Sequence, residues 1–215
     1  MAYQIKEVFY TLQGEGAQSG RPSVFCRFAG CNLWSGREED RTKAVCQFCD
    51  TNFVGADGAG GGRFESAADL AEQILSFWPR GETQSRFTVL TGGEPLLQLD
   101  EALIDELHRR SFQVAVETNG TVPAPSGLDW ICVSPKAGAP WVQRFGDELK
   151  LIYPQPGLMP QDVVRELADL NFSHWWLQPM DGPALADHTK GAVQHCLKDP
   201  RWRLSLQTHK FIGIA

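Results

Sequence analysis

Short apolar runs alternate with amphipathic segments along most of the chain. Runs rich in β-branched and aromatic residues predict strands at 23–28, 86–91, 112–118, 129–134, 148–153, 174–178 and 202–208. Apolar residues spaced three or four positions apart predict helices at 66–78, 100–111, 160–170 and 187–199. Ser66 and Asp100 stand where helix N-caps are expected, and Pro160 suits a first helical turn. Strands that alternate with helices favour a largely parallel α/β sheet or barrel.

Two of the connections are too rich in Pro and Gly to be helices. They span residues 119–128 and 135–147. We therefore expect an abridged, TIM-like barrel of the α/β class, with about six parallel strands and few helices. The length of 215 residues suits one domain over residues 1–215, and the segment "GADGAGGGR" (55–63) is expected to be a flexible loop.

Polar residues follow five of the predicted strands. The five clusters are "TGGEP" (91–95), "ETNG" (117–120), "SPK" (134–136), "QPMDG" (178–182) and "QTHK" (207–210). Since the carboxyl ends of parallel strands form one face where ligands bind, the clusters predict a single pocket, although strands can also simply end in polar turns. Gly92 and Gly93 would let a ligand approach the backbone, and Glu94 could accept hydrogen bonds from an amine.

The overall composition argues against several classes of protein. A net charge of −6 does not suit a general nucleic-acid binder, which needs a basic face. The first ten residues lack the apolar core of a secretory signal, and no stretch approaches the roughly 20 apolar residues of a membrane span. Six cysteines without an export signal favour a reducing cytoplasm and metal or redox chemistry. We therefore expect a cytoplasmic protein with no nucleic-acid or membrane partner.

Three of the cysteines stand in the polar stretch "CNLWSGREEDRTKAVCQFCDT" (31–51). They are Cys31, Cys46 and Cys49, with fourteen residues between the first two and two between the last two. Soft thiolates select zinc, copper(I) or iron–sulfur clusters. A [4Fe–4S] cluster usually has a cysteine on each iron, so three thiolates leave one iron open to an exogenous ligand, such as a cofactor with an amine and a carboxylate.

Zinc is the competing interpretation of this stretch. A structural zinc site needs a fourth ligand, which Cys26 could supply. Cys26 lies in the apolar alternation of a predicted strand, however, and this favours a core position. Cys132 lies in an apolar strand and Cys196 on a helix, so both are expected to be packing residues.

The three cysteines, with the aromatic Phe48 just before the last of them, resemble the cluster motif of the radical S-adenosylmethionine superfamily. "TGGEP" is similar to its motif for the methionine amino group. The insertion at residues 32–45 departs from the usual, shorter spacing, but it resembles that of the 7-carboxy-7-deazaguanine synthases. Further similar motifs are "FYTLQGEG" (9–16), "FCRFAGCNLW" (25–34), "CDT" (49–51), "ETNG", "VSPK", "QPMDG" and "LQTHK".

This resemblance implies a reaction and its cofactors. The reaction converts 6-carboxy-5,6,7,8-tetrahydropterin into 7-carboxy-7-deazaguanine with loss of ammonia, in queuosine and 7-deazapurine biosynthesis. It breaks a carbon–hydrogen bond that has no acidic proton at hand, so a cofactor must supply a radical. The resemblance implies a [4Fe–4S] cluster, S-adenosylmethionine and Mg²⁺, together with a pterin substrate, a flavodoxin-type reductant and a homodimer.

The resemblance also implies roles for individual residues. Cys31, Cys46 and Cys49 would hold the cluster, and no side chain would act alone as the catalytic group. The expected contacts of S-adenosylmethionine are Phe48, Cys49, Asp50, Gly93, Glu94, Ser134, Pro135, Lys136, Gln178, Pro179, Met180 and Asp181. Those of the substrate are Leu12, Gln13, Gly14, Glu15, Arg27, Thr91, His209 and Ala215, with the segment 209–215 closing the site. Thr51 would bind Mg²⁺, a hard cation that prefers oxygen ligands.

Several of these residues have a second interpretation. Thr51 could instead be a helix N-cap, and Glu15 a solvated turn residue. Arg27 lies among apolar neighbours, so it needs either a bound carboxylate or a structural Asp or Glu partner. Glu117 could bind the ribose or form a salt bridge at its strand end. Two other functions also fit the cysteines: an activase that makes a glycyl radical on a partner protein, and a zinc-stabilised binding module.

Overall fold

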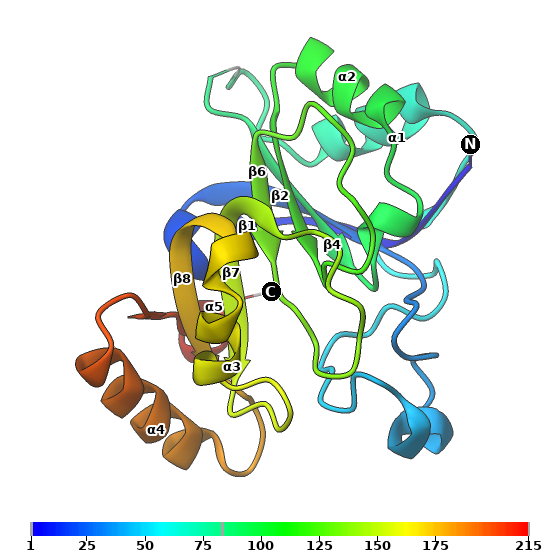
Figure 1. Ribbon diagram of the computed structural model, residues 1–215. Helices are drawn as coiled ribbons and strands as arrows, with labels where there is room; N and C mark the ends of the chain where they lie inside the picture. The colour runs from blue at the N-terminus through cyan, green and yellow to red at the C-terminus, as the bar shows by residue number, and fades with distance from the viewer. Residues whose placement is uncertain (1, 83, 215) are drawn as a thin grey trace.

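The computed structural model describes residues 2–82 and 84–214, which form one mixed sheet (Figure 1). In this part of the chain the strand order is β3-β1-β2-β4-β5-β6-β7-β8-β9. Strand β1 is antiparallel to both β2 and β3, whereas every pairing from β2–β4 through to β8–β9 is parallel. The bounds are β1 Tyr3–Leu12, β2 Pro22–Phe28, β3 Gly62–Phe64, β4 Phe87–Gly92, β5 Gln113–Thr118, β6 Trp130–Val133, β7 Phe145–Tyr153, β8 Asn171–Pro179 and β9 Arg203–Leu204.

Four of the five described α-helices cover one face of this sheet. Figure 1 shows α1 and α2 side by side over the part of the sheet that contains β2 and β4, with α3 and α4 at the other end, near β7 and β8. The α-helices are α1 Ala67–Ser76, α2 Glu101–Arg109, α3 Pro160–Arg165, α4 Leu185–Lys198 and α5 Thr208–Ile212. Short 3₁₀ turns occupy η1 Gly16–Gln18, η2 Glu38–Lys43, η3 Pro95–Leu97 and η4 Leu167–Asp169.

The predicted α/β class with mostly parallel strands is confirmed, but the strand count is wrong. The described residues contain seven parallel strands, rather than about six, and two antiparallel ones. The order runs linearly from β3 at one edge to β9 at the other, and within the described ranges no ladder joins the two edges into a barrel. Strand β1 escaped prediction because a bulge between Ile5 and Glu7 interrupts its alternation, so that Ile5 and Val8 both enter the core.

Three predicted elements have different bounds in the structure. The helix expected at 160–170 ends at Arg165, and a 3₁₀ turn follows it. The strand expected at 202–208 covers only Arg203–Leu204, because Thr208 begins a helix whose residues turn toward the site. The loop expected at 55–63 contributes its last residues to the edge strand β3.

Alternate side chains of each strand face opposite sides of the sheet. In β2, Val24, Cys26 and Phe28 are buried in the core under α1 and α2, whereas Phe25 and Arg27 face the opposite side. Strand β7 repeats this arrangement, since Leu149 and Leu151 enter a second core while Lys150 between them faces the other way. On the opposite face, Phe87, Val89 and Ala115 form a small buried cluster with Phe25 and Trp130. The positions nearer the carboxyl ends of the strands on this face are therefore free to form a site.

The described residues contain no helix that is both long and apolar enough to span a membrane.

The predicted N-caps Ser66 and Asp100 are confirmed, and they differ in the further hydrogen bonds that they accept. Ser66 Oγ accepts a hydrogen bond from the Asp69 amide at 3.2 Å. Asp100 Oδ1 accepts one from the Leu103 amide at 3.0 Å and a second from the hydroxyl of Tyr3 at 2.7 Å. Tyr3 is buried, so Asp100 joins the first strand to the second helix as well as capping that helix.

We expect Asp100→Ala to destabilise the protein more than Ser66→Ala does. Loss of the Ser66 cap costs about 1 kcal/mol of the free energy of unfolding. Loss of Asp100 also leaves the buried Tyr3 hydroxyl without its acceptor, which raises the cost to about 2–3 kcal/mol. Urea unfolding measures both, with Asp100→Asn as the control that keeps an acceptor. Equal losses in the two alanine variants would contradict this account.

Candidate functional site

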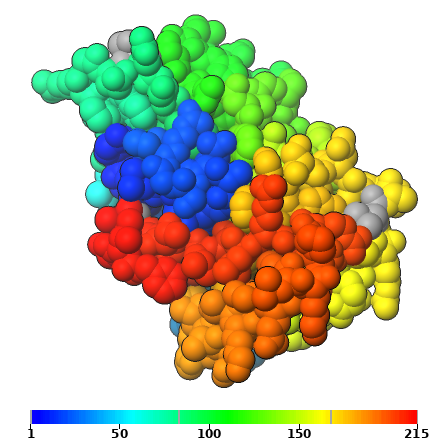
Figure 2. Space-filling model, turned by 90° about the vertical axis from the view of Figure 1, so that its left-hand side faces the viewer, coloured from blue at the N-terminus to red at the C-terminus, as the bar shows by residue number. Residues whose placement is uncertain are grey.

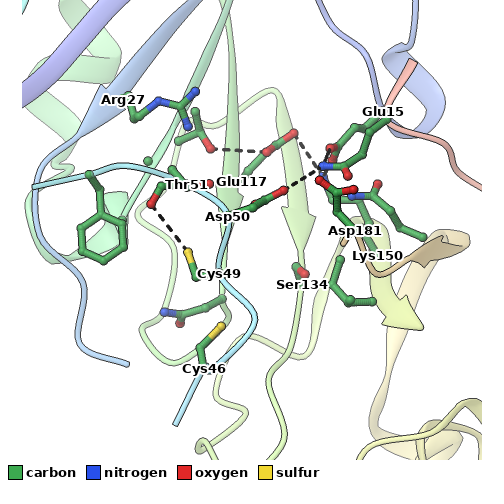
Figure 3. Close-up of a pocket in the computed structure, with 18 of the residues that line it drawn as sticks. Glu15, Arg27, Cys46, Cys49, Asp50, Thr51, Glu117, Ser134, Lys150 and Asp181 are labelled. Carbon is green, nitrogen blue, oxygen red and sulfur yellow. Dashed lines mark hydrogen bonds and ion pairs between the residues drawn. The ribbon is translucent and has the colours of Figure 1, made fainter. Parts of the chain in front are cut away.

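A cavity of about 370 Å³ opens at the carboxyl ends of the parallel strands. Residues that follow β4, β5, β6, β8 and β9 all line it, so the predicted convergence of five polar clusters on one pocket is confirmed. Figure 3 shows that the cysteine loop forms one wall and that the strands with their polar ends form the other.

Most of the residues singled out from the sequence meet here. Those that line the cavity are Leu12, Gln13, Gly14, Glu15, Arg27, Cys31, Cys46, Phe48, Cys49, Asp50, Thr51, Thr91, Gly93, Ser134, Lys136, Gln178, Pro179, Met180, Asp181 and His209. Glu94 and Pro135 do not line it. Ala215 lies outside the described residues.

Glu94 is buried, and its carboxylate accepts hydrogen bonds from other groups of the chain. Its side chain accepts hydrogen bonds from the Thr118 hydroxyl and the Asn119 amide, both at 2.7 Å, and from the Leu96 amide at 3.0 Å. Burial raises the pKa of this carboxyl, and the three donors act in the opposite direction. Glu94 thus joins the end of β4 to the end of β5 from below the cavity wall.

The glycines before Glu94 are needed for packing within the chain. A Cβ on Gly93 would lie 1.8 Å from the carbonyl oxygen of Gly30, and one on Gly92 would lie 2.4 Å from that of Phe28. Gly92 also has a φ of +115°, which favours glycine. These glycines therefore bring the end of β4 against the chain that leads to Cys31, a reason that the sequence pattern did not reveal.

The three clustered cysteines are free thiols on one side of the cavity. The Cys46 thiol donates a hydrogen bond to Cys49, which lowers the pKa of Cys49 to about 6 and raises that of Cys46. The Leu33 amide donates to Cys31 Sγ at 3.4 Å. In residues 2–82 and 84–214, no three His, Cys, Asp or Glu side chains are close enough together to hold a single metal ion.

The structure contradicts the zinc site that includes Cys26. This residue is fully buried in the core on the helix-covered face of the sheet, on the opposite side from the cavity. Cys132 is buried and Cys196 packs against the second core, as predicted.

Thr51 lies beside Cys49 on the cavity wall. The Cys49 thiol donates weakly to the Thr51 carbonyl oxygen at 3.9 Å (Figure 3). The interpretation of Thr51 as a helix N-cap is wrong, since residues 51–61 contain no helix.

Lys150 also lines the cavity, and the sequence analysis missed it. It lies in β7 with only 6% of its side chain exposed, forms an ion pair with Glu15 and lies 3.4 Å from Glu117 (Figure 3). Burial alone would lower the pKa of Lys150, but the carboxylates of Glu117 and Glu15 outweigh burial and raise it. A lysine between two leucines in a predicted strand was the available signal, and the same signal had singled out Arg27.

The two carboxylates around Lys150 also bind neutral side chains. Glu117 accepts hydrogen bonds from the Gln13 amide at 3.0 Å and the Thr91 hydroxyl at 3.3 Å. Glu15 accepts one from Gln207 at 3.1 Å. The salt-bridge interpretation of Glu117 is therefore confirmed, and the interpretation of Glu15 as a solvated turn residue is wrong.

Arg27 has the structural partner that its apolar surroundings required. Its Nε donates to Glu7 Oε1 at 2.8 Å, and both residues line the cavity. Glu7 comes from β1, the strand that the sequence analysis did not predict, so this partner could not be named in advance.

The C-terminal helix α5 lies against the mouth of the cavity. The Lys210 amine lies 2.6 Å from both Asp50, in the cysteine loop, and Asp181, after β8. The Thr208 amide donates to the Gly14 carbonyl oxygen at 3.0 Å, and a Cβ on Gly14 would collide with His209. Figure 2 shows this segment, in red, beside the N-terminal strands, in blue.

We expect Lys150→Met to destabilise the protein, and more at neutral than at acid pH. Burial alone would raise the pKa of Glu15, but the charge and hydrogen bond of Lys150 lower it, so this pair stabilises the fold above about pH 4.5 and less below it. Without Lys150 the two carboxylates are uncompensated, which costs about 3 kcal/mol at pH 7.5. At pH 5 Glu15 can take up a proton, so the loss is smaller.

Urea unfolding at the two pH values measures this difference. The control is Lys150→Met combined with Glu15→Gln, which is expected to lie closer to the unsubstituted protein than Lys150→Met alone does. A loss that is the same at both pH values would contradict the assignment.

The chain is similar to known proteins over its full length. A scan against protein-family models finds no match. The 7-carboxy-7-deazaguanine synthases of Bordetella pertussis and Burkholderia multivorans are 62% and 56% identical over 215 and 214 residues, covering 100% of this chain and of theirs. The crystal structure of QueE from Escherichia coli matches with a TM-score of 0.69 and 25% identity, over 96% of this chain and 94% of that one. Given these similarities over the full length, the chain belongs to the family of 7-carboxy-7-deazaguanine synthases.

Proposed function

We propose that the protein converts 6-carboxy-5,6,7,8-tetrahydropterin into 7-carboxy-7-deazaguanine with loss of ammonia, as a magnesium-dependent radical S-adenosylmethionine lyase. The observation that carries this proposal is the position of Cys31, Cys46 and Cys49, whose free thiols line the same cavity as the polar groups of the strand ends. The product would serve queuosine or another 7-deazapurine.

Cys31, Cys46 and Cys49 would hold a [4Fe–4S] cluster. The donor set fits this group, because three soft thiols line one cavity. When bound, the cluster and S-adenosylmethionine supply one-electron chemistry that can remove hydrogen from a carbon with no acidic proton.

The S-adenosylmethionine side of the cavity would be formed by the cysteine loop and the ends of β4, β6 and β8. Lys136 orders this wall, since its amine donates to the carbonyl and hydroxyl oxygens of Ser134, both at 2.6 Å, and lies 5.9 Å from the ring centre of Phe48. Glu94 acts here through the Thr118 and Asn119 groups that it holds. The proposed contacts are Phe48, Cys49, Asp50, Gly93, Ser134, Pro135, Lys136, Gln178, Pro179, Met180 and Asp181.

The substrate side would be formed by the turn after β1 and the polar ends of β2, β4 and β7. Gln13, Glu15 and Glu117 offer hydrogen-bond acceptors to the N–H groups of a pterin, and Lys150 pairs with both carboxylates. Arg27 and His209 would bind the carboxylate of the substrate, because both are donors that line the same cavity. Leu12, Gly14, Thr91 and Ala215 complete the proposed set.

Thr51 would supply an oxygen to Mg²⁺ beside the substrate carboxylate. Its position on the cavity wall, next to Cys49, supports this role. Mg²⁺ keeps several ligands from water and substrate, so one protein oxygen is enough to place it.

A flavodoxin-type protein would supply the electron, and the active form would be a homodimer. Six free cysteines suit a reducing compartment, which supports the predicted cytoplasmic location.

Anaerobic reconstitution with iron and sulfide tests the proposed function. Incubation with carboxytetrahydropterin, S-adenosylmethionine and dithionite is expected to form the deazapurine, whereas Cys46→Ala is expected to lose the brown colour, the stoichiometric iron and the turnover. Cys196→Ala, which changes a thiol outside the cavity, is the matched control and should retain all three. Stoichiometric zinc in place of iron and sulfide would instead favour a zinc-stabilised module.

Magnesium titration tests the role of Thr51. We expect Thr51→Ala to keep its cluster but to lose at least tenfold in turnover at low magnesium, because one hard oxygen ligand is gone. Thr51→Ser retains the hydroxyl and is expected to keep the magnesium response. If Thr51→Ala responds to magnesium as the unsubstituted protein does, the metal lies elsewhere.

A further inference from the structure

The fourteen-residue insertion between Cys31 and Cys46 folds back onto the cysteine loop. It contains the 3₁₀ turn η2, found by its light-blue colour at the lower right of Figure 1. The amides of Val45 and Cys46 both donate to the Leu33 carbonyl oxygen, at 3.1 and 3.3 Å, so the two ends of the insertion are joined. The chain after Cys46, in contrast, has no helix or strand through residue 53 and needs other support.

Arg41, in η2, provides that support. Its Nη1 donates to the carbonyl oxygens of Gln47 at 2.8 Å and Cys49 at 3.1 Å. These two carbonyls lie on either side of Phe48, so one guanidinium nitrogen spans the turn between the last two cysteines. The two hydrogens of Nη1 allow both bonds at once.

The guanidinium of Arg41 is itself held in place. Its Nε and Nη2 donate to the two oxygens of Glu38 at 2.7 and 2.5 Å, which is a bidentate pair. Its other contact is the ring of Trp34, whose centre lies 4.0 Å from the guanidinium carbon. Trp34 is buried and packs edge-on against Phe53, which is also buried, so the anchor extends from the insertion into the protein interior.

We propose that Arg41 is a positioning residue that clamps the Cys46–Cys49 turn in the conformation that holds the cluster, and that the long insertion serves to deliver it. The inference rests on the proposed function, since it assumes that these cysteines bind a cluster. A guanidinium suits this task because its planar fork can pair with Glu38, stack on Trp34 and span two carbonyls together, which an ammonium group cannot do.

The rate of iron release tests the clamp. In the full chain, reconstituted without air, Arg41→Ala is expected to release iron to a ferrous chelator about tenfold faster than the unsubstituted protein, because charge-assisted hydrogen bonds of this kind are lost. Arg41→Lys keeps the charge without the fork and is expected to release iron almost as fast. Restoration of the slow rate by lysine would overturn the clamp.

Arg37→Ala is the matched control. Arg37 lies in the same insertion, its side chain is 71% exposed, and its nearest carboxylate, Glu39, is 3.9 Å away. This variant is expected to release iron within about twofold of the unsubstituted rate, because exposed pairs of this kind contribute little. The proposal is overturned if Arg41→Ala behaves as Arg37→Ala does.

Amide hydrogen exchange of the metal-free protein separates this proposal from the proposed function. The hydrogen-bonded amides of Val45 and Cys46 lie where the chain enters the clamped turn, and they are expected to exchange faster in Arg41→Ala than in Arg37→Ala. If the unsubstituted protein takes up no cluster, the proposed function fails. Hydrogen exchange of the metal-free protein then still tests whether Arg41 holds the turn. Equal exchange in the two metal-free variants would overturn the clamp.

Discussion

The alternation of side chains across a sheet that is covered on only one face determines where chemistry can occur in this protein. Each strand that sends an apolar residue toward the helices sends the next one toward the open face. Near the carboxyl ends of the strands, the open-face positions carry Arg27, Thr91, Glu117, Lys150 and Gln178, all of which line the cavity. A shift of one residue in any of these strands would bury a charged or polar side chain in the core and remove it from the site, so the site and the core constrain the same register.

This constraint explains why the general position of the site could be predicted from the sequence. Apolar runs located most strands, the residues after them were polar, and parallel strands bring such ends together. The elements that the sequence did not predict each depend on a contact between distant segments. The bulge in β1 hid a strand that pairs with β2, and the residues around Thr208 became a helix that contacts Gly14 rather than a continuation of β9.

The roles of single residues were harder to predict, because a residue type does not reveal its partners. Glu94 follows a strand and precedes a proline, as a ligand-binding carboxylate would, yet it accepts hydrogen bonds from Thr118 and Asn119 at the end of β5 and from the nearby Leu96 amide, beneath the cavity wall. Gly93 was expected to make room for a ligand, and it also makes room for the backbone of Gly30, a packing role that its position in the sequence did not reveal. Lys150 looked like one polar interruption of an apolar strand, and only the fold shows that two carboxylates meet it.

The positively charged side chains around the cavity differ in whether they are paired with a carboxylate. Among the described residues that line it, Arg27, Lys150 and Lys210 are each paired with at least one carboxylate, whereas the amine of Lys136 donates to the neutral oxygens of Ser134. Burial lowers the pKa of Lys136, and the charges of Cys46 and Cys49 act in the opposite direction. Thiolate formation in the cysteine loop therefore favours the charged form of this lysine. The cation that lacks a carboxylate partner is thus the one that lies near the cysteines, whereas the positive charges of Arg27, Lys150 and Lys210 are offset by neighbouring carboxylates.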